Sequence, residues 1–202
     1  MVERGPLYTV KQPLRVRLTI KRSRFIASLA PANTEQEARE YIASIESEFP
    51  DATHHTYAYR LGFINNGIER SSDAREPAGT AGPPMLQELN GARVTNVVVV
   101  ATRYFGGIKL GIGGLNRAYR SCARACLEEA RLVKIIELAY FKVILDYDDM
   151  GPAIRYIESC DGEILDIEYG EQVIINFSVP ATVQQQVATG LGDVSRGRAQ
   201  LS

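Results

Sequence analysis

The residues with the greatest capacity for chemistry lie in TRYFGGIKLGIGGLNRAY, at positions 102–119. Five glycines occupy nine positions of this segment: Gly106, Gly107, Gly111, Gly113 and Gly114. Glycine loses more backbone entropy on folding than other residues, so this density indicates positive φ angles or close approach to bare backbone. A glycine loop before a helix also directs free N–H groups and a positive dipole end toward an anion. Arg103, Lys109 and Arg117 flank the loop with matching charge.

The spacing of the glycines in this loop does not match the common nucleotide-binding motifs. The sequence lacks G-x-x-x-x-G-K-[ST], and Gly111, Gly113 and Gly114 do not fit G-x-G-x-x-G. Three interpretations stay open: a tight strand-to-helix turn, a site for a phosphate or similar anion at Lys109 and the helix start, and a nucleoside triphosphate site.

Two other segments carry polar side chains that we expect to meet the loop. His54 and His55 are the only histidines, and as strand neighbours they point to opposite faces and do not readily share a metal ion. Each is interpreted as a hydrogen-bonded structural residue or a catalytic one. Asp73, Glu76 and Thr80 lie in a long polar segment, residues 62–80, of a length typical of functional or disordered loops. We expect this segment to form a polar wall facing the glycine loop.

Basic and aromatic residues add a possible nucleic-acid surface. Arg117, Arg120 and Arg124 form a stripe on one helix face, which is either a solvated face or an extension of Lys109 and Arg103 toward RNA. Arg60 and Tyr104 complete the predicted ligand-binding or nucleic-acid-binding residues. No metal site and no cofactor are expected. Cys122 and Cys126 share an apolar helical face and are interpreted as buried thiols.

The elements that position these residues follow from hydrophobic periodicity. Residues 14–20 and 23–29 alternate as a hairpin, and Thr34 with Glu37 predicts the start of a helix that Pro50 ends. The pattern further predicts a strand at 55–61, a short helix at 84–89, a buried strand at 96–103 and a helix at about 114–133.

The C-terminal third has a different pattern. A long strand at 134–147, a helix, two strands joined at Gly170, a short helix and a final strand give the β-α-β-β-α-β order of a ferredoxin-like domain. We therefore expect two domains, 1–136 and 137–202. The first carries 19 Lys+Arg and 13 Asp+Glu, and the second carries 4 and 11, so the domains have opposite net charge. The acidic second domain would repel RNA.

Composition excludes several classes of protein. No apolar run approaches the roughly 20 residues of a membrane span, and the N-terminus lacks a signal-peptide core. Three cysteines without metal-ligand spacing argue against a disulfide framework. We expect a cytoplasmic protein with reduced thiols and no membrane association; the sequence leaves its oligomeric state open.

Three separated motifs carry a resemblance to a known family. THHTYAYRLG (53–62), ERSSDAREPAGTAGPPM (69–85) and the glycine segment together resemble the IMPACT family over nearly the whole chain. The resemblance implies an α+β fold: an N-terminal domain like the second domain of ribosomal small-subunit protein five, then a ferredoxin-like domain. Ala74-Arg75 stands where the family commonly has Asp-Gly or a similar pair. Eukaryotic members act in translational control.

These observations support two main hypotheses. The first is a translation-related regulatory protein that contacts RNA, the ribosome or a ribosome-associated partner through the basic glycine loop. The second is an enzyme that acts on a small phosphorylated or anionic metabolite in a pocket formed by the same loops. A protein–protein adaptor is a third, and it would show an exposed apolar patch.

Overall fold

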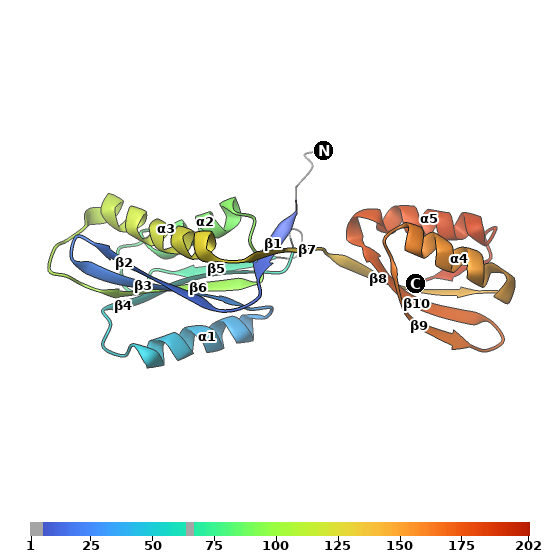
Figure 1. The fold of residues 1–202 in the computed structure, drawn as a ribbon, viewed down its shortest axis with the longest axis horizontal. Helices are drawn as coiled ribbons and strands as arrows, with labels where there is room; N and C mark the ends of the chain where they lie inside the picture. Colours follow the sequence, from blue (N-terminus) through green and yellow to red (C-terminus); the bar gives the residue numbers. More distant parts are fainter. Residues whose placement is uncertain (1–5, 64–66) are drawn as a thin grey trace. The chain divides into compact units, whose positions relative to one another are not determined.

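The computed structural model describes residues 6–63 and 67–202, and the chain divides into two compact units, Met1–Ile135 and Ile136–Ser202 (Figure 1). The mixed α+β fold class predicted from the sequence is confirmed. No helix among the described residues is long and apolar enough to cross a membrane.

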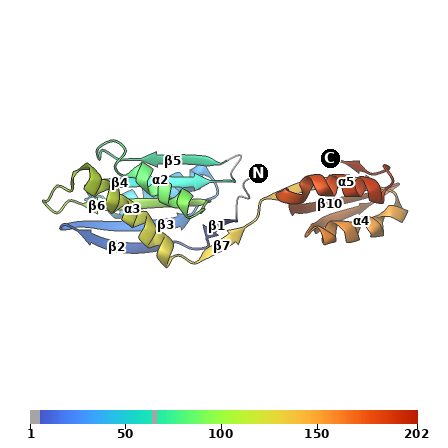
Figure 2. The same ribbon diagram turned by 90° about the horizontal axis from the view of Figure 1, so that it is seen from above.

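The N-terminal unit is a three-layer structure built on a five-stranded antiparallel sheet. The strand order is β2-β3-β6-β4-β5. Helix α1 covers one face of the sheet, and α2 and α3 cover the other (Figures 1 and 2). The strands and helices have these bounds: β2 Leu14–Ile20, β3 Ser23–Pro31, α1 Glu35–Glu48, β4 His54–Leu61, β5 Ile68–Ser72, α2 Gly82–Gly91, β6 Val97–Tyr104 and α3 Gly111–Glu129.

The central strand β6 explains the run of valines. Val97 and Val99 pack into the core under α2 and α3, whereas Val98 and Val100 pack into the core under α1. A strand buried on both faces needs apolar side chains at consecutive positions. This strand ends at Tyr104, so it delivers Arg103 and the glycine loop to one end of the sheet.

Two sequence predictions for this unit were wrong in detail. Residues 62–80 are not one irregular segment, because β5 lies inside it and pairs with β4. Its alternation is hidden because every residue of β5 is at least partly exposed at the sheet edge. Helix α3 begins at Gly111 and ends at Glu129; the chain then turns extended at Ala130, and β7 (Leu132–Ile135) pairs with β1 (Leu7–Val10).

The C-terminal unit has the ferredoxin-like order that the sequence predicted. Its sheet has the order β11-β8-β10-β9, and α4 and α5 pack on one face of it (Figure 1). The single strand expected at 134–147 is instead two strands. β7 ends at Ile135 and pairs with β1 of the N-terminal unit, whereas β8 begins at Leu138. The bounds are β8 Leu138–Leu145, α4 Tyr147–Ser159, β9 Glu163–Tyr169, β10 Val173–Pro180, a 3-10 turn Ala181–Val183, α5 Gln184–Val194 and β11 Gln200–Leu201.

Candidate functional site

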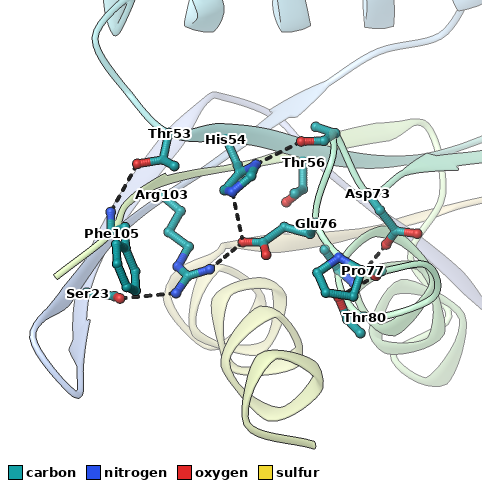
Figure 3. A network of polar contacts seen from close by, with 12 residues as sticks. Ser23, Thr53, His54, Thr56, Asp73, Glu76, Pro77, Thr80, Arg103 and Phe105 are labelled. Carbon is teal, nitrogen blue, oxygen red and sulfur yellow. Dashed lines mark hydrogen bonds and ion pairs between the residues drawn. The ribbon is translucent and has the colours of Figure 1, made fainter. Parts of the chain in front are cut away.

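A cleft of about 460 Å³ opens where β4 begins, β6 ends and α3 starts. We call it the glycine cleft, because the glycine loop forms one side of it. Figure 3 shows its polar floor, to which β4, β6 and the segment after β5 each contribute a side chain. The lining residues are Thr53, His54, Glu76, Pro77, Arg103, Phe105, Lys109, Leu110, Gly111, Ile112 and Leu115.

Glu76 is the centre of the polar floor. Its Oε1 accepts hydrogen bonds from Arg103 Nη1 at 2.5 Å and from the Tyr119 hydroxyl at 2.6 Å. His54 Nε2 lies 3.7 Å from the same oxygen (Figure 3). Burial, reinforced by the hydrogen bond to the Glu76 carboxylate, raises the pKa of Tyr119 far above its usual value, so its hydroxyl remains a donor.

Two aromatic rings lie beside the guanidinium of Arg103. Its guanidinium carbon lies 5.6 Å from the centroid of Phe25 and 5.5 Å from that of Phe105. Nη2 donates to the Ser23 hydroxyl at 3.3 Å. Nε is buried and has no hydrogen-bond partner in the described part of the chain. Arg103 is therefore a buried member of an ion pair rather than a free surface cation.

The two histidines face different surroundings, as alternation along a strand predicts. His54 Nδ1 lies 2.9 Å from the Ala74 carbonyl oxygen, so Nδ1 carries the hydrogen and Nε2 faces Glu76. His55 contacts the Thr102 hydroxyl and the Phe49 carbonyl oxygen. His55 lines a separate hollow of about 440 Å³, so it does not belong to the glycine cleft.

Asp73 shapes the loop that carries Glu76. Its carboxylate accepts backbone N–H groups from Gly79 at 2.7 Å, Ala81 at 2.8 Å and Gly82 at 3.0 Å. Ala81, the residue before α2, provides no side-chain cap, so Asp73 caps this helix from a distance. The Thr80 hydroxyl donates to the Pro77 carbonyl in the same loop. Asp73 and Thr80 thus act on the loop's shape.

The glycines of the loop have two different roles. A Cβ on Gly106 would lie 2.1 Å from the backbone of Arg22, so the loop passes directly against the β2–β3 turn. Gly107 and Gly111 have φ angles of +84° and +69°. Gly113 and Gly114 lie in the first turn of α3. The tight-turn interpretation therefore accounts for Gly106, Gly107 and Gly111.

Arg60 and Tyr104 also lie outside the cleft. Arg60 is six residues along β4 from His54, about 20 Å at the usual rise per residue, and its Nε pairs with Glu69 at 3.5 Å. Tyr104 donates to Asp51, stacks under Arg24 and lines another hollow. A role of these two residues in binding stays a prediction, and it would not involve the glycine cleft.

The basic stripe is partly neutralised. Arg120 and Arg124 share the single carboxylate of Glu88 on α2, whose oxygens lie 3.5 Å and 3.1 Å from them. Arg103 is paired with Glu76. Lys109 and Arg117 are exposed and have no ion pair in the described residues. The basic surface expected from the sequence is therefore smaller than the number of its lysines and arginines indicates.

An apolar rim surrounds the cleft instead. Phe105, Ile108 and Ile112 are 46%, 39% and 71% exposed, although each is a large hydrophobic side chain. Phe105 and Ile112 line the cleft, Ile108 lies between them in the chain, and Pro77, which also lines the cleft, is exposed as well. Clustered exposed apolar side chains of this kind mark binding surfaces.

Sequence reasoning missed several contributors to the site. Thr53 and Leu115 lie in segments that the sequence singles out, but a lone threonine and a helical leucine have no distinctive chemistry, and Ser23 lies in an ordinary strand pattern. The ring of Tyr119 packs against Phe25 in the core, and its hydroxyl reaches Glu76. Within the described residues no three His, Cys, Asp or Glu side chains gather to hold a metal ion.

Comparison with family models matches both units. Residues 21–127 match the Impact N-terminal domain. Residues 143–198 match a domain family of unknown function, DUF1949.

Individual relatives match over nearly the full length. The chain is 35% identical to IMPACT family member YigZ of Escherichia coli over 190 residues, which covers 94% of this chain and 93% of the relative. It is 34% identical to IMPACT family member YvyE of Bacillus subtilis, covering 96% and 89%. A solved structure described as that of a hypothetical protein is 34% identical, with a TM-score of 0.67 and coverage of 96% and 95%.

Proposed function

This chain belongs to the IMPACT family, and we propose that it is a translation-related regulatory protein that docks a ribosome-associated protein at its glycine cleft. The translational part rests on the family, whose eukaryotic members act in translational control. Rat protein IMPACT is one such relative, 34% identical over 116 residues. That match covers 55% of this chain, so it concerns chiefly the unit that holds the cleft.

The observation that carries the docking proposal is the apolar rim. Among the described residues of the N-terminal unit, five large hydrophobic side chains are exposed, and three of them are Phe105, Ile108 and Ile112. Burying such side chains against a partner is favourable at about 25 cal/mol per Å² of apolar area. The rim and the cleft behind it form one concave apolar surface with a polar floor.

A protein partner fits this surface better than RNA does. Phosphate contacts need unpaired lysine and arginine side chains, yet Arg103, Arg120 and Arg124 are bound to carboxylates. Tyr104 and Arg60, which would extend an RNA-binding surface, lie away from the cleft.

Binding also fits the floor better than catalysis does. Glu76 is the carboxylate in the cleft, but its Oε1 contacts Arg103, Tyr119 and His54. A general base needs access to the proton that it removes, whereas the Glu76 side chain is only 4% exposed. These contacts favour a fixed polar floor over an acid–base centre.

The test is co-sedimentation of the full chain with ribosomes and their associated proteins at two salt concentrations. We expect binding that changes little with salt and that Ile112→Ser reduces strongly. Tyr169→Ser is the matched control, since Tyr169 is 65% exposed but lies in the other unit.

Two outcomes would contradict the proposal. If the chain does not co-sediment at either salt concentration, the proposed docking function is wrong. Steeply salt-dependent binding that is lost in a Lys109→Ala, Arg117→Ala double variant and kept in Ile112→Ser would instead indicate phosphate contacts with RNA.

A further inference from the structure

We infer that the glycine cleft receives the carboxyl terminus of a polypeptide whose last residue is apolar. The inference deepens the proposed docking function and rests on it for the protein nature of the partner. It specifies the chemistry that the cleft recognises: a single carboxylate attached to an apolar side chain.

The apolar half of the cleft can accommodate the apolar side chain of the terminal residue. Pro77, Phe105, Leu110, Ile112 and Leu115 contribute its walls. A volume of about 460 Å³ is in the range that holds small ligands and leaves room for a terminal residue and part of the one before it.

The start of α3 provides donors for the carboxylate. Helix α3 has 19 residues, and Leu110, which precedes it, makes no side-chain capping hydrogen bond. The first-turn N–H groups of a helix have no partner within the helix, and the dipole gives them positive potential. Leu110, Gly111 and Ile112 all line the cleft, so this helix end opens into it.

Arg103 is an independent indication of a missing acceptor. It is only 4% exposed, it lines the cleft, and its Nε has no hydrogen-bond partner among the described residues. Buried polar side-chain atoms nearly always have a partner, so an unpartnered donor in a cleft wall favours a ligand that brings an acceptor.

The charge of the cleft matches a monoanion. Arg103 and Glu76 cancel each other at 2.5 Å, and Lys109 remains as an exposed cation. Counting Arg103, Glu76 and Lys109, the lining carries one net positive charge. One carboxylate balances that charge, whereas a dianionic phosphate would not be balanced. Recognition of a terminal carboxylate by backbone N–H groups is an established mode of peptide binding.

The test is an NMR titration of the isotope-labelled full chain with an acetylated leucine–phenylalanine dipeptide. The dipeptide is used as the free acid and as the carboxyl-terminal amide. We expect the acid to shift the amide signals of Gly111 and Ile112 in a saturable manner, with the amide binding at least about tenfold more weakly, because it lacks the charge.

Two variants locate the charge. Lys109→Ala should weaken binding of the acid several-fold and leave binding of the amide unchanged. Lys142→Ala removes a lysine from the other unit and should change neither. Both positions are at least partly exposed, so neither change threatens folding.

The results separate this inference from the proposed function. Equal binding of acid and amide, no binding of either, or equal shifts with inorganic phosphate would each overturn the carboxylate inference. Since the titration uses the isolated chain, acid-selective binding without ribosome co-sedimentation would support the cleft chemistry and reject the docking partner. Co-sedimentation without peptide binding would do the reverse.

Discussion

At the scale of the residue, Glu76 connects the polar side chains that form the floor of the cleft. It joins Arg103 from β6, Tyr119 from α3 and His54 from β4 through a single carboxylate oxygen. The side chains of Glu76 and Arg103 are 4% and 5% exposed. Water therefore screens their pairing little, and each buried charge is compensated by the other.

Replacement of Glu76 by alanine should be strongly destabilising. The change leaves the Arg103 guanidinium buried without its carboxylate, and breaking such a buried pair costs about 3–5 kcal/mol. The free energy of unfolding, measured by urea denaturation of the N-terminal unit's transition, should fall by that order. The matched control is Glu48→Ala, which removes the solvent-exposed partner of Arg15 and should change stability little. An equal loss in both variants would contradict this account.

At the scale of the element, the loop between β5 and α2 holds Glu76 in place under strain. Ala74 and Arg75 both have positive φ angles, of 44° and 69°. Residues with a Cβ disfavour this region, whereas glycine adopts it freely. A glycine at position 75 would therefore suit the backbone better than Arg75 does. The three hydrogen bonds to Asp73 maintain the loop despite this strain.

Arg75→Gly should leave the protein as stable as before or up to about 1.5 kcal/mol more stable. Relief of roughly 1–2 kcal/mol of left-handed strain exceeds or balances the entropy cost of glycine, about 0.5–1 kcal/mol. Thermal denaturation of the variant provides the measurement. Ala43→Gly, at an exposed position inside α1, is the matched control and should lose about 1 kcal/mol. Similar losses in the two variants would show that Arg75 is not strained.

At the scale of the whole molecule, two units of opposite charge each have their own core. The N-terminal unit has apolar clusters on both faces of its sheet, and the C-terminal unit has one cluster between its sheet and α4 and α5. Residues 136–202 contain 11 acidic and 4 basic side chains, a net charge of −7. Like charges at this density repel one another in the folded unit.

The C-terminal unit, produced alone as residues 136–202, should unfold cooperatively and gain stability with salt. Salt screens its repulsion over a Debye length of about 8 Å at physiological ionic strength. Circular dichroism melts at increasing sodium chloride should show a rising midpoint. The 1–135 unit, which spreads a net charge of +6 over twice as many residues, is the comparison and should respond less. A midpoint that is insensitive to salt would reject self-repulsion as a stability term.

The sequence by itself determined the features that arise from local pattern. Four consecutive valines required a strand buried on both faces, and alternation with turn residues gave the ferredoxin-like order. The glycine density located the loop that lines the cleft, because φ angles and close contacts act on single residues. The sequence indicates that Asp73, Glu76 and the histidines are candidate polar residues of the site. It does not distinguish the separate role of each.

Only the tertiary structure decided which charges are free. Glu76 meets Arg103 across 27 residues of chain and Tyr119 across 43, and Glu88 meets Arg124 across 36. No local pattern encodes such pairs, because they depend on where separate strands and helices end in space. Their formation neutralises part of the predicted basic surface, and the fold leaves Phe105 and Ile112 exposed at the cleft. A charge acts on its surroundings according to distance and burial, and these are properties of the fold.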